Sequence, residues 1–465
     1  MTSLIVRSVT IVLLLAVSGL GQGFSQVNPE PYRLEFTGGG ARAEGMGNAF
    51  LAVSDDVTAG SWNPAGLYGL EKPIISLAWS SLRPRGESST IITIGDDTRV
   101  HSGSFSSVSA MNFVAPLRVK GHQFVGSVSF TRNSNEYLPI LLSMNSIVIN
   151  RIPLDVEGRT QYIIDTIPFE ENRETELSGG LESISFGAGT RVFGNFAAGV
   201  ALNIYSGTMI RDWRQLSLSE PHMDPVDGQT RQMVLTVQSL DSTKFSGFNF
   251  TLGVKYSGEK FDFGGIIRTP FSLNAKTGRS LYIINKINGL PVDNITDTLY
   301  FDDNLIKYDV PWIVAAGVAY RPTDKLTLAA DGELRSFGNS KIDVRDSLFL
   351  DPGGENTEFF DERDPEWDDV FHLRLGGEYM MESSIGRIPL RAGFGYVPLI
   401  LPSYNAEGTK SRTGRTTMSL GAGIWWEQIH LDAAYTYSSF DYDEYGFFSI
   451  NSKDHHLNLM FTGYF

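Results

Sequence analysis

Few side chains in this sequence have types and spacings that suggest catalysis. His430 and Asp432 stand two residues apart, so on a strand they share one face. That pair, and the adjacent His455 and His456, suggest hydrolysis or metal binding. No serine nucleophile can be matched to them, and the pattern of outer-membrane phospholipases is not recognisable. We therefore expect no catalytic residues and no enzyme.

Two further stretches suggest ligand binding. The glycine-rich run GGGARAEGMG has no strand before it and no lysine in the Walker position, which argues against a phosphate-binding loop. The acidic run DPGGENTEFFDERDPEWDDV lacks EF-hand spacing, so we interpret it as a solvated loop in place of a calcium site. The chain has no cysteine, which excludes thiolate metal sites and disulfides. We expect neither a metal nor a cofactor.

Composition and the N-terminus restrict the partners and the location. The net charge of −15 and the isoelectric point near 5.0 argue against nucleic acid, whose phosphates need a basic surface. Residues 1–25 combine Arg7, an apolar run and small residues, and predict a secretory signal peptide. No other apolar stretch approaches the length of about 20 residues that a spanning helix needs. The mature chain is therefore expected to be exported.

From about residue 73 onward, apolar and polar residues alternate with the period of a β-strand. In GFNFTLGVKY, for example, every second residue is a large apolar one. Such alternation also occurs in soluble sandwiches. If the strands close into a membrane barrel, the charged residues must face the lumen, because Arg or Lys on the lipid side costs about 2–4 kcal/mol near the midplane. These lumen residues would be Asp331, Glu333, Arg374, Glu378 and Arg391.

The spacing of the connections favours the barrel. Strand-like segments start near residues 73, 105, 121, 180, 195, 245, 259, 309, 324, 370, 387, 413, 428 and 454. Short links alternate with long polar ones at 83–104, 133–179, 208–244, 281–308, 336–369, 398–412 and 438–453. Turns on one side and long loops on the other are typical of outer-membrane barrels. We predict an all-β fold, a transmembrane antiparallel barrel of about 14 strands over 73–465.

The C-terminal residues DHHLNLMFTGYF support the same interpretation. Leu457, Leu459, Phe461 and Phe465 lie on one face of a final strand, and the chain stops on Phe465. Such a strand resembles the C-terminal signal that the outer-membrane barrel-assembly machinery reads. We therefore expect that machinery and the outer-membrane lipid as partners, and the bacterial outer membrane as the location.

Residues 26–72 are predicted to fill the lumen. A barrel of this size would leak, since smaller barrels are filled by their own side chains and larger ones hold a water channel. The segment is glycine-rich, lacks strand alternation and precedes the first strand. Within it, Asn63-Pro64-Ala65-Gly66 suits a type I turn, and we expect the flanking Trp62 and Leu67 to anchor that turn inside the barrel.

The segment GARAEGMGNAFLAVSDDVTAGSWNPAGL resembles the N-terminal hatch of the FadL/TodX family of outer-membrane transporters for long-chain fatty acids and other hydrophobic compounds. That family has a glycine-rich run, a paired acidic stretch and an Asn-Pro-Ala turn in this order. The matching residues here are Gly45, Gly47, Asp55, Asp56, Asn63, Pro64 and Ala65. Later segments such as IPLRAGFGYVP also resemble the family's barrel strands, so the likeness extends over the mature chain.

The resemblance implies a plugged barrel that carries hydrophobic molecules passively, without chemistry of its own. It also implies a sideways exit at an inward kink of the third strand, where Gly126 is the candidate for weakened pairing. From the residues themselves, Arg374 and Arg391 are either wall-to-plug ion pairs or a site for a ligand carboxylate. An alternative function is that of PorV-like barrels of the same family, which serve as shuttles or anchors in type IX secretion and bind proteins.

Overall fold

A computed structural model describes most of the chain after residue 35. The described residues are 36, 38–91, 96–102, 104–119, 122–133, 140–156, 159–224, 228–291, 299–350, 356–405, 407–444 and 448–465. The predicted signal peptide lies outside them. None of the helices within the described residues is long and apolar enough to cross a membrane.

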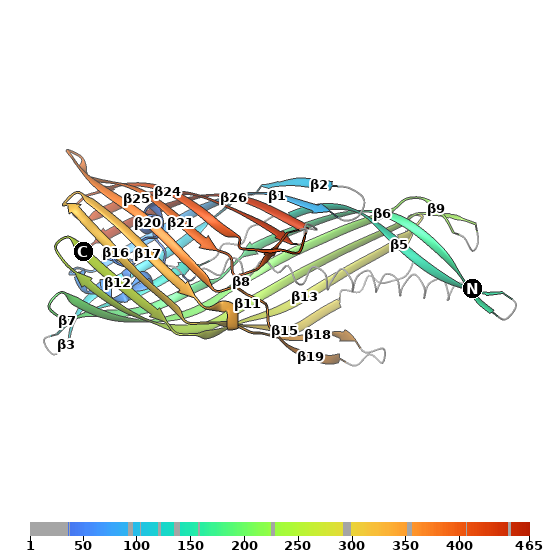
Figure 1. Ribbon diagram of the computed structural model, residues 1–465, viewed down its shortest axis with the longest axis horizontal. Helices are drawn as coiled ribbons and strands as arrows, with labels where there is room; N and C mark the ends of the chain where they lie inside the picture. The colour runs from blue at the N-terminus through green and yellow to red at the C-terminus, as the bar shows by residue number, and fades with distance from the viewer. Residues whose placement is uncertain are drawn as a thin grey trace.

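The dominant feature is a closed antiparallel barrel of 14 strands, as the sequence predicted (Figure 1). In chain order its strands are β1 (Ile74–Ile91), β3 (Phe105–Val119), β4 (His122–Arg132), β7 (Glu182–Phe193), β8 (Phe196–Ser219), β11 (Met233–Ser257), β12 (Phe261–Arg268), β16 (Ile313–Thr323), β17 (Leu326–Arg335), β20 (Val370–Ser383), β21 (Gly386–Pro398), β24 (Gly414–Trp425), β25 (Ile429–Glu444) and β26 (Phe448–Tyr464). The last strand pairs with the first from Ile74–Tyr464 to Thr90–Phe448, which closes the wall and leaves no barrel edge unpaired.

The two ends of the barrel differ as expected from the link lengths. At the short-turn end, six tight connections join neighbouring strands, for example β7 to β8 and β20 to β21. At the opposite, extended end, several stretches that we expected to be loops are strands instead. They are β2 (Asp96–Ser102), β5 (Ile140–Val156), β6 (Arg159–Gly179), β9 (His222–Met223), β10 (Thr230–Arg231), β13 (Phe271–Ile287), β14 (Leu290–Pro291), β15 (Leu299–Val310), β18 (Ile342–Leu350), β19 (Asn356–Arg363), β22 (Ser403–Tyr404) and β23 (Lys410–Ser411), with a short 3-10 helix η3 (Phe337–Asn339).

Most of the expected long loops are therefore wrong, and three of them serve as examples. Residues 208–219 and 233–244 belong to the long strands β8 and β11, which pair from Val234–Leu218 to Tyr256–Phe196. Most of 281–308 lies in β13, β14 and β15. Residues 438–453 form the end of the β25–β26 hairpin, paired up to Glu444–Phe448. These strands carry polar residues on both faces, and so they lack the alternation of apolar and polar residues that marks the rest of the barrel.

The outer surface of the spanning part is apolar. On β11, Phe248, Phe250, Leu252 and Val254 point outward and are exposed, while the odd-numbered residues between them are buried. Aromatic rings gather near the short turns, where Phe261 stacks on Tyr320 at 4.7 Å and Phe193 lies 4.9 Å from Phe196. An apolar band edged by aromatic residues is the exterior of a barrel that spans a membrane.

One place in the wall breaks the strand period. The β12–β16 pairing ends at Arg268–Ile313 and resumes between β13 and β15 at Phe271–Val310, in the same register. Pro270 and Pro311 therefore stand opposite each other, and neither can donate a ladder hydrogen bond. Before the break, even-numbered residues of β12 such as Arg268 are buried. After the break, odd-numbered residues of β13 such as Leu273 are buried. The break thus changes which residue parity faces the lumen.

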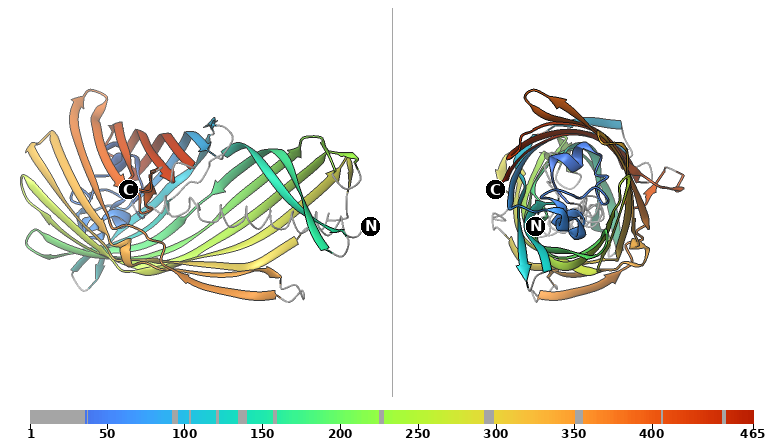
Figure 2. Two further views of the ribbon diagram at one scale, coloured as in Figure 1. Left: turned by 45° about the vertical axis from the view of Figure 1, so that its right-hand side comes forward. Right: turned by 90° about the vertical axis from the view of Figure 1, so that its left-hand side faces the viewer.

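Residues 38–72, hereafter the N-terminal segment, lie inside the barrel near its short-turn end (Figure 2). They form α2 (Ala41–Gly45), α3 (Ala59–Trp62) and the 3-10 helix η2 (Pro64–Gly69). Contacts join α2 to β21, β24, β25 and β26, and η2 to β4, β7, β8 and β11. The segment therefore touches opposite sides of the wall and crosses the lumen.

Candidate functional site

Glycines on the inner face of the wall allow the N-terminal segment to pack closely against it. A Cβ built on Gly253 would lie 2.3 Å from Asn63 Oδ1, and one on Gly264 would lie 2.2 Å from the Leu51 carbonyl oxygen. The same close approach occurs at Gly189, Gly199, Gly376 and Gly393. Only glycine permits backbone to pack against backbone at this distance. The many glycines of the sequence therefore include a belt that fits this segment.

Hydrogen bonds of the Asn-Pro-Ala triplet hold the turn in place. Asn63 Oδ1 accepts a hydrogen bond from the Ala65 amide at 3.2 Å, and Asn63 Nδ2 donates to the carbonyls of Leu51 and of Val254 in β11. Asn63 is thus the N-cap of η2, with Pro64 at its first position, so the expected type I turn is the start of a 3-10 helix. Asn63 joins two parts of the segment to the wall.

The two apolar residues around the triplet have separate contacts. Trp62 is buried, donates from Nε1 to the Gly39 carbonyl at 3.1 Å and packs edge-on to Phe50. Leu67 is also buried and lies against the inner wall, 3.1 Å from the Cβ position of Gly189. Trp62 therefore ties the turn to its own segment, and Leu67 ties it to the barrel.

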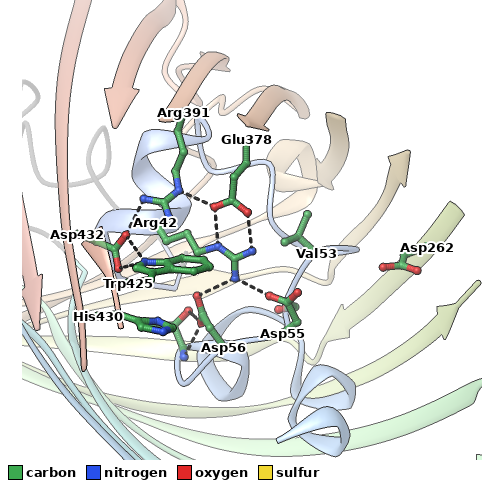
Figure 3. Close-up of polar contacts among 12 residues, drawn as sticks. Arg42, Val53, Asp55, Asp56, Asp262, Glu378, Arg391, Trp425, His430 and Asp432 are labelled. Carbon is green, nitrogen blue, oxygen red and sulfur yellow. Dashed lines mark hydrogen bonds and ion pairs between the residues drawn. The ribbon is translucent and has the colours of Figure 1, made fainter. Parts of the chain in front are cut away.

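Arg42 in α2 is the centre of an ion-pair network that the sequence did not reveal (Figure 3). It donates to Glu378 from Nη2 at 2.9 Å and from Nε at 3.0 Å, and to Asp55 from Nη1 at 2.5 Å. Arg391 donates to the same Glu378 at 2.7 Å and to Asp432 at 2.7 Å. Two arginines and their carboxylates therefore join the segment to β20, β21 and β25.

Trp425 completes this network. Its ring faces both guanidinium groups, with Arg42 and Arg391 each 5.3 Å from the ring centroid, and its Nε1 donates to Asp432 at 3.0 Å. On its other side it stacks on His430 at 4.4 Å. The His430–Asp432 pair therefore belongs to the anchor of the segment, with His430 Nδ1 3.1 Å from the Tyr464 hydroxyl and Asp432 accepting hydrogen bonds from Arg391 and Trp425.

Burial and charge act on the segment's own ionisable groups. Burial disfavours the charged form of Arg42, but Asp55 and Glu378 outweigh it and hold the pKa of Arg42 well above its ordinary value. Burial raises the pKa of Asp56, against the opposing effects of Arg42 and of hydrogen bonds from Thr58. Arg42 therefore stays charged, whereas burial makes the ionised form of Asp56 less favourable.

Backbone groups of the segment are bonded to charged wall residues as well. Asp331 Oδ2 accepts from the amides of Phe50 and Leu51 at 2.6 and 2.8 Å. Lys255 Nζ donates to the carbonyls of Val53 and Ser54 at 2.6 and 3.1 Å. Two opposite charges on the wall thus satisfy the two ends of the turn over residues 50–54.

The remaining predicted site residues have definite places. Gly45 and Gly47 lie in the segment against β24 and β21, with the Gly47 amide bonded to Ser419. Arg374 is buried and bonded to Glu333 at 3.0 Å, and Arg391 belongs to the network above, so both already pair with wall carboxylates. A role for them in binding a ligand carboxylate stays a prediction.

Gly126 lies in the third barrel strand, β4, as expected. It pairs with Ala115 on β3 and with Ala188 on β7, and both ladders run through it without a register shift. The pairing of β4 is unbroken at that residue, so a side exit at Gly126 stays a prediction.

Between the N-terminal segment and the extended end, the inner face of the wall turns apolar. These residues, hereafter the apolar lumen cluster, are buried inward-facing side chains that come mostly from β6, β8, β11, β13, β15 and β16. They are Phe36, Leu177, Leu181, Tyr205, Met209, Phe245, Leu273, Ala275, Tyr308, Val310, Ile313, Phe337, Trp367, Val370 and Ile400. A water channel would present polar groups here. The cluster is instead suited to surround an apolar molecule.

Phe36 fills the middle of this cluster. Its ring meets Tyr205 edge-on at 5.4 Å and Phe271 at 5.6 Å, and the Arg335 guanidinium lies 5.9 Å from its centroid. The chain just before the N-terminal segment therefore supplies an aromatic group to the cluster. Within the described residues, no group of three or more His, Asp or Glu side chains is arranged to hold a metal ion.

Comparison with known proteins places this fold. No protein-family model and no curated protein matches the sequence. Among solved structures, a FadL homologue of Pseudomonas aeruginosa is similar at 12% identity, covering 92% of this chain and 99% of its own, with a TM-score of 0.55. The toluene transporters TodX of Pseudomonas putida (12% identity, 93% and 100% covered, TM-score 0.54) and TbuX of Ralstonia pickettii (13%, 92% and 99%, 0.54) are similar too. The chain therefore has the plugged-barrel fold seen in FadL and TodX structures.

Proposed function

We propose that the protein is a FadL/TodX-type channel of the bacterial outer membrane that lets hydrophobic molecules pass through its barrel. The apolar band outside supports insertion in a membrane, and the short-turn end would then face the periplasm. The exposed apolar face of β26, ending at Phe465, supports recognition by the barrel-assembly machinery. Residues 26–72 would act as the hatch, of which 36 and 38–72 are described.

The observation that carries this proposal is the apolar lumen cluster. Transfer of apolar surface from water is favourable by roughly 25 cal/mol per Å², so an apolar solute would collect there and not in a polar lumen. The polar network beneath the cluster joins segment to wall through ion pairs that can be broken and remade, as Arg42 and Glu378 illustrate. A hydrophobic molecule would thus bind next to the N-terminal segment, and the segment can move.

The cluster also favours transport over the PorV-like alternative. A barrel that only anchors or shuttles proteins binds them at its outer loops and gains nothing from a buried apolar lumen. Covalent chemistry has no part in the proposal, which requires only binding, displacement of the segment and release.

Binding to the purified protein tests the proposal. Phe245 and Ser246 are neighbours on β11, but Phe245 is buried in the apolar lumen cluster whereas Ser246 is exposed on the outside. We expect F245D to abolish binding of toluene and of oleate in detergent, and S246D to bind as the wild type does. A heat-modifiability gel confirms that each variant is a folded barrel. Equal binding by a folded F245D would refute the lumen as the site.

A further inference from the structure

Two cations on the outer face of the barrel have no carboxylate partner. Arg83 of β1 and Lys453 of β26 are exposed on the outside of the wall. Within the described residues, neither side chain forms a hydrogen bond or an ion pair. By comparison, Arg132 of β4 also faces outward but pairs with Glu182. In a chain with 53 acidic and 38 basic residues, two neighbouring cations without a carboxylate are unexpected.

The two cations are brought together by the pairing of the last strand with the first. Arg83 stands directly opposite His455, and Lys453 is two residues away from His455 on the same face of β26. Residues in such diagonal positions lie about 7–8 Å apart, within the reach of arginine and lysine side chains. His455 is held beside them by the Tyr435 hydroxyl, 2.6 Å from its Nδ1. The register thus places two unpaired charges where one anion can contact both.

This pair of cations directly follows the apolar band, on the side of the extended end. On these strands the band ends at Trp79 and Leu457, which are both exposed. On the neighbouring strand β25, the ring of Tyr437 lies 5.3 Å from that of His455. Tryptophan and tyrosine are enriched at the level of lipid headgroups. The cations therefore lie at the height of the headgroups, next to a surface that acyl chains cover.

A phosphate on a lipid headgroup fits this arrangement. A guanidinium group binds two phosphate oxygens, and an ammonium group adds a point charge. A free phosphate would meet the same two cations, but only a lipid also covers Trp79 and Leu457 with its acyl chains. The outer leaflet of a bacterial outer membrane consists largely of glycolipids with phosphates on their sugar headgroups. Such a glycolipid matches both the charge and the apolar surface.

We propose that Arg83 and Lys453 bind a phosphate on the headgroup of a glycolipid in the outer leaflet. The inference goes beyond the proposed function, because this lipid is bound outside the barrel and is not transported. It rests on the proposed function only for the orientation, in which the extended end faces outward. Since β1 and β26 close the barrel, the lipid would lie across the closing pair of strands.

Binding of diphosphoryl lipid A to the full chain in detergent, measured by native mass spectrometry, tests the inference. The comparison ligand is lipid A from which both phosphates have been removed. The wild type should bind the phosphorylated form about thirtyfold more tightly, because each basic residue near an anionic lipid contributes a factor of about five. The double variant R83Q/K453Q should lose this preference and should melt as the wild type does in detergent without added lipid.

Two controls make the outcome specific. R132Q removes an outward-facing arginine that already has Glu182 as its partner, so it should keep the preference for the phosphorylated form. Inorganic phosphate in millimolar excess should leave lipid A bound, because free phosphate gains nothing from the apolar surface at Trp79 and Leu457. A heat-modifiability gel shows that each variant is a folded barrel.

The inference is overturned if the wild type binds both forms of lipid A equally, or if R83Q/K453Q keeps the preference. An equal loss in R132Q would also overturn it, since binding would then follow net charge. Displacement by inorganic phosphate would do the same, since the site would then take an anion without a lipid. Toluene binding is measured on the same proteins and should not differ between them. Its absence in the wild type would refute the proposed function and leave the lipid site standing.

Discussion

The replacement of Glu378 by Gln should loosen the N-terminal segment without unfolding the barrel. The Glu378 side chain is 6% exposed and accepts two hydrogen bonds from Arg42 and one from Arg391, at 2.7–3.0 Å. Glutamine has nearly the same shape, but it is neutral and turns an NH₂ group toward a guanidinium. Arg391 keeps Asp432 and Arg42 keeps Asp55, so the change weakens one side of the network.

The expected size follows from the burial of this pair. Removing one partner of a buried ion pair costs about 3–5 kcal/mol. If that free energy is lost from docking of the segment, its opening becomes about a hundred- to several thousandfold more frequent. The lower value applies if the glutamine keeps one hydrogen bond to Arg42.

Amide hydrogen exchange followed by mass spectrometry measures this opening. The Phe50 and Leu51 amides bond to Asp331, and the Gly47 amide bonds to Ser419, so all three report docking of the segment to the wall. Their exchange should accelerate by the factor above in E378Q, whereas exchange in β25 and β26 should not change.

A matched control is E182Q, because Glu182 pairs with Arg132 at a site where both side chains are partly exposed. A pair of this kind contributes at most about 1 kcal/mol, so E182Q should leave exchange in the N-terminal segment unaltered. Unchanged exchange in E378Q, or equal acceleration throughout the barrel, would refute the idea that this network holds the segment.

Three more predictions concern the segment and the cluster. G253A places a methyl group 2.3 Å from Asn63 Oδ1 and should release the segment, seen as faster proteolysis of it, whereas G265A, whose Cβ meets Val254 at an ordinary 3.4 Å, should not. Because burial raises the pKa of Asp56, docking of the N-terminal segment should be stronger below the ordinary carboxyl pKa and should weaken as the pH rises through the raised pKa. Amide hydrogen exchange of the segment measured against pH should show this dependence, and D56N should flatten it. F36A should open a cavity beside Tyr205 and Phe271 and tighten toluene binding measured by calorimetry, and a weaker affinity would show that the Phe36 ring is part of the ligand site.

Sequence patterns predicted the barrel because its spanning strands obey one physical rule. Each spanning residue meets either lipid or the lumen, so alternation and the position of charges such as Asp331 and Arg391 follow from the period of the strand. The links at the short-turn end were found for the same reason. The strands of the extended end escaped prediction, since polar residues stand on both of their faces.

The contacts of the site were largely beyond the reach of the sequence. Arg42 and Glu378 are 336 residues apart, and no local pattern joins them. The inward position of Leu273 depends on the break at Thr269–Pro270; strict alternation from Arg268 would have pointed Leu273 outward. Alternation can place Arg374 and Arg391 in the lumen, but it cannot show which wall carboxylates they pair with. The one sequence signal of the break in the strand period is the position of Pro270 opposite Pro311. This position can be recognised only once the strands are paired.

Uptake by proteoliposomes measures whether hydrophobic molecules pass through the barrel. Vesicles that contain the purified protein and an internal acyl-CoA synthetase to trap oleate, or an internal solvatochromic dye for toluene, are compared with empty vesicles and with vesicles that contain F245D. At least one of these molecules should enter faster with the wild type than with empty vesicles, and with F245D both should enter at the rate of empty vesicles. Equal rates for the wild type and empty vesicles would contradict the proposed function.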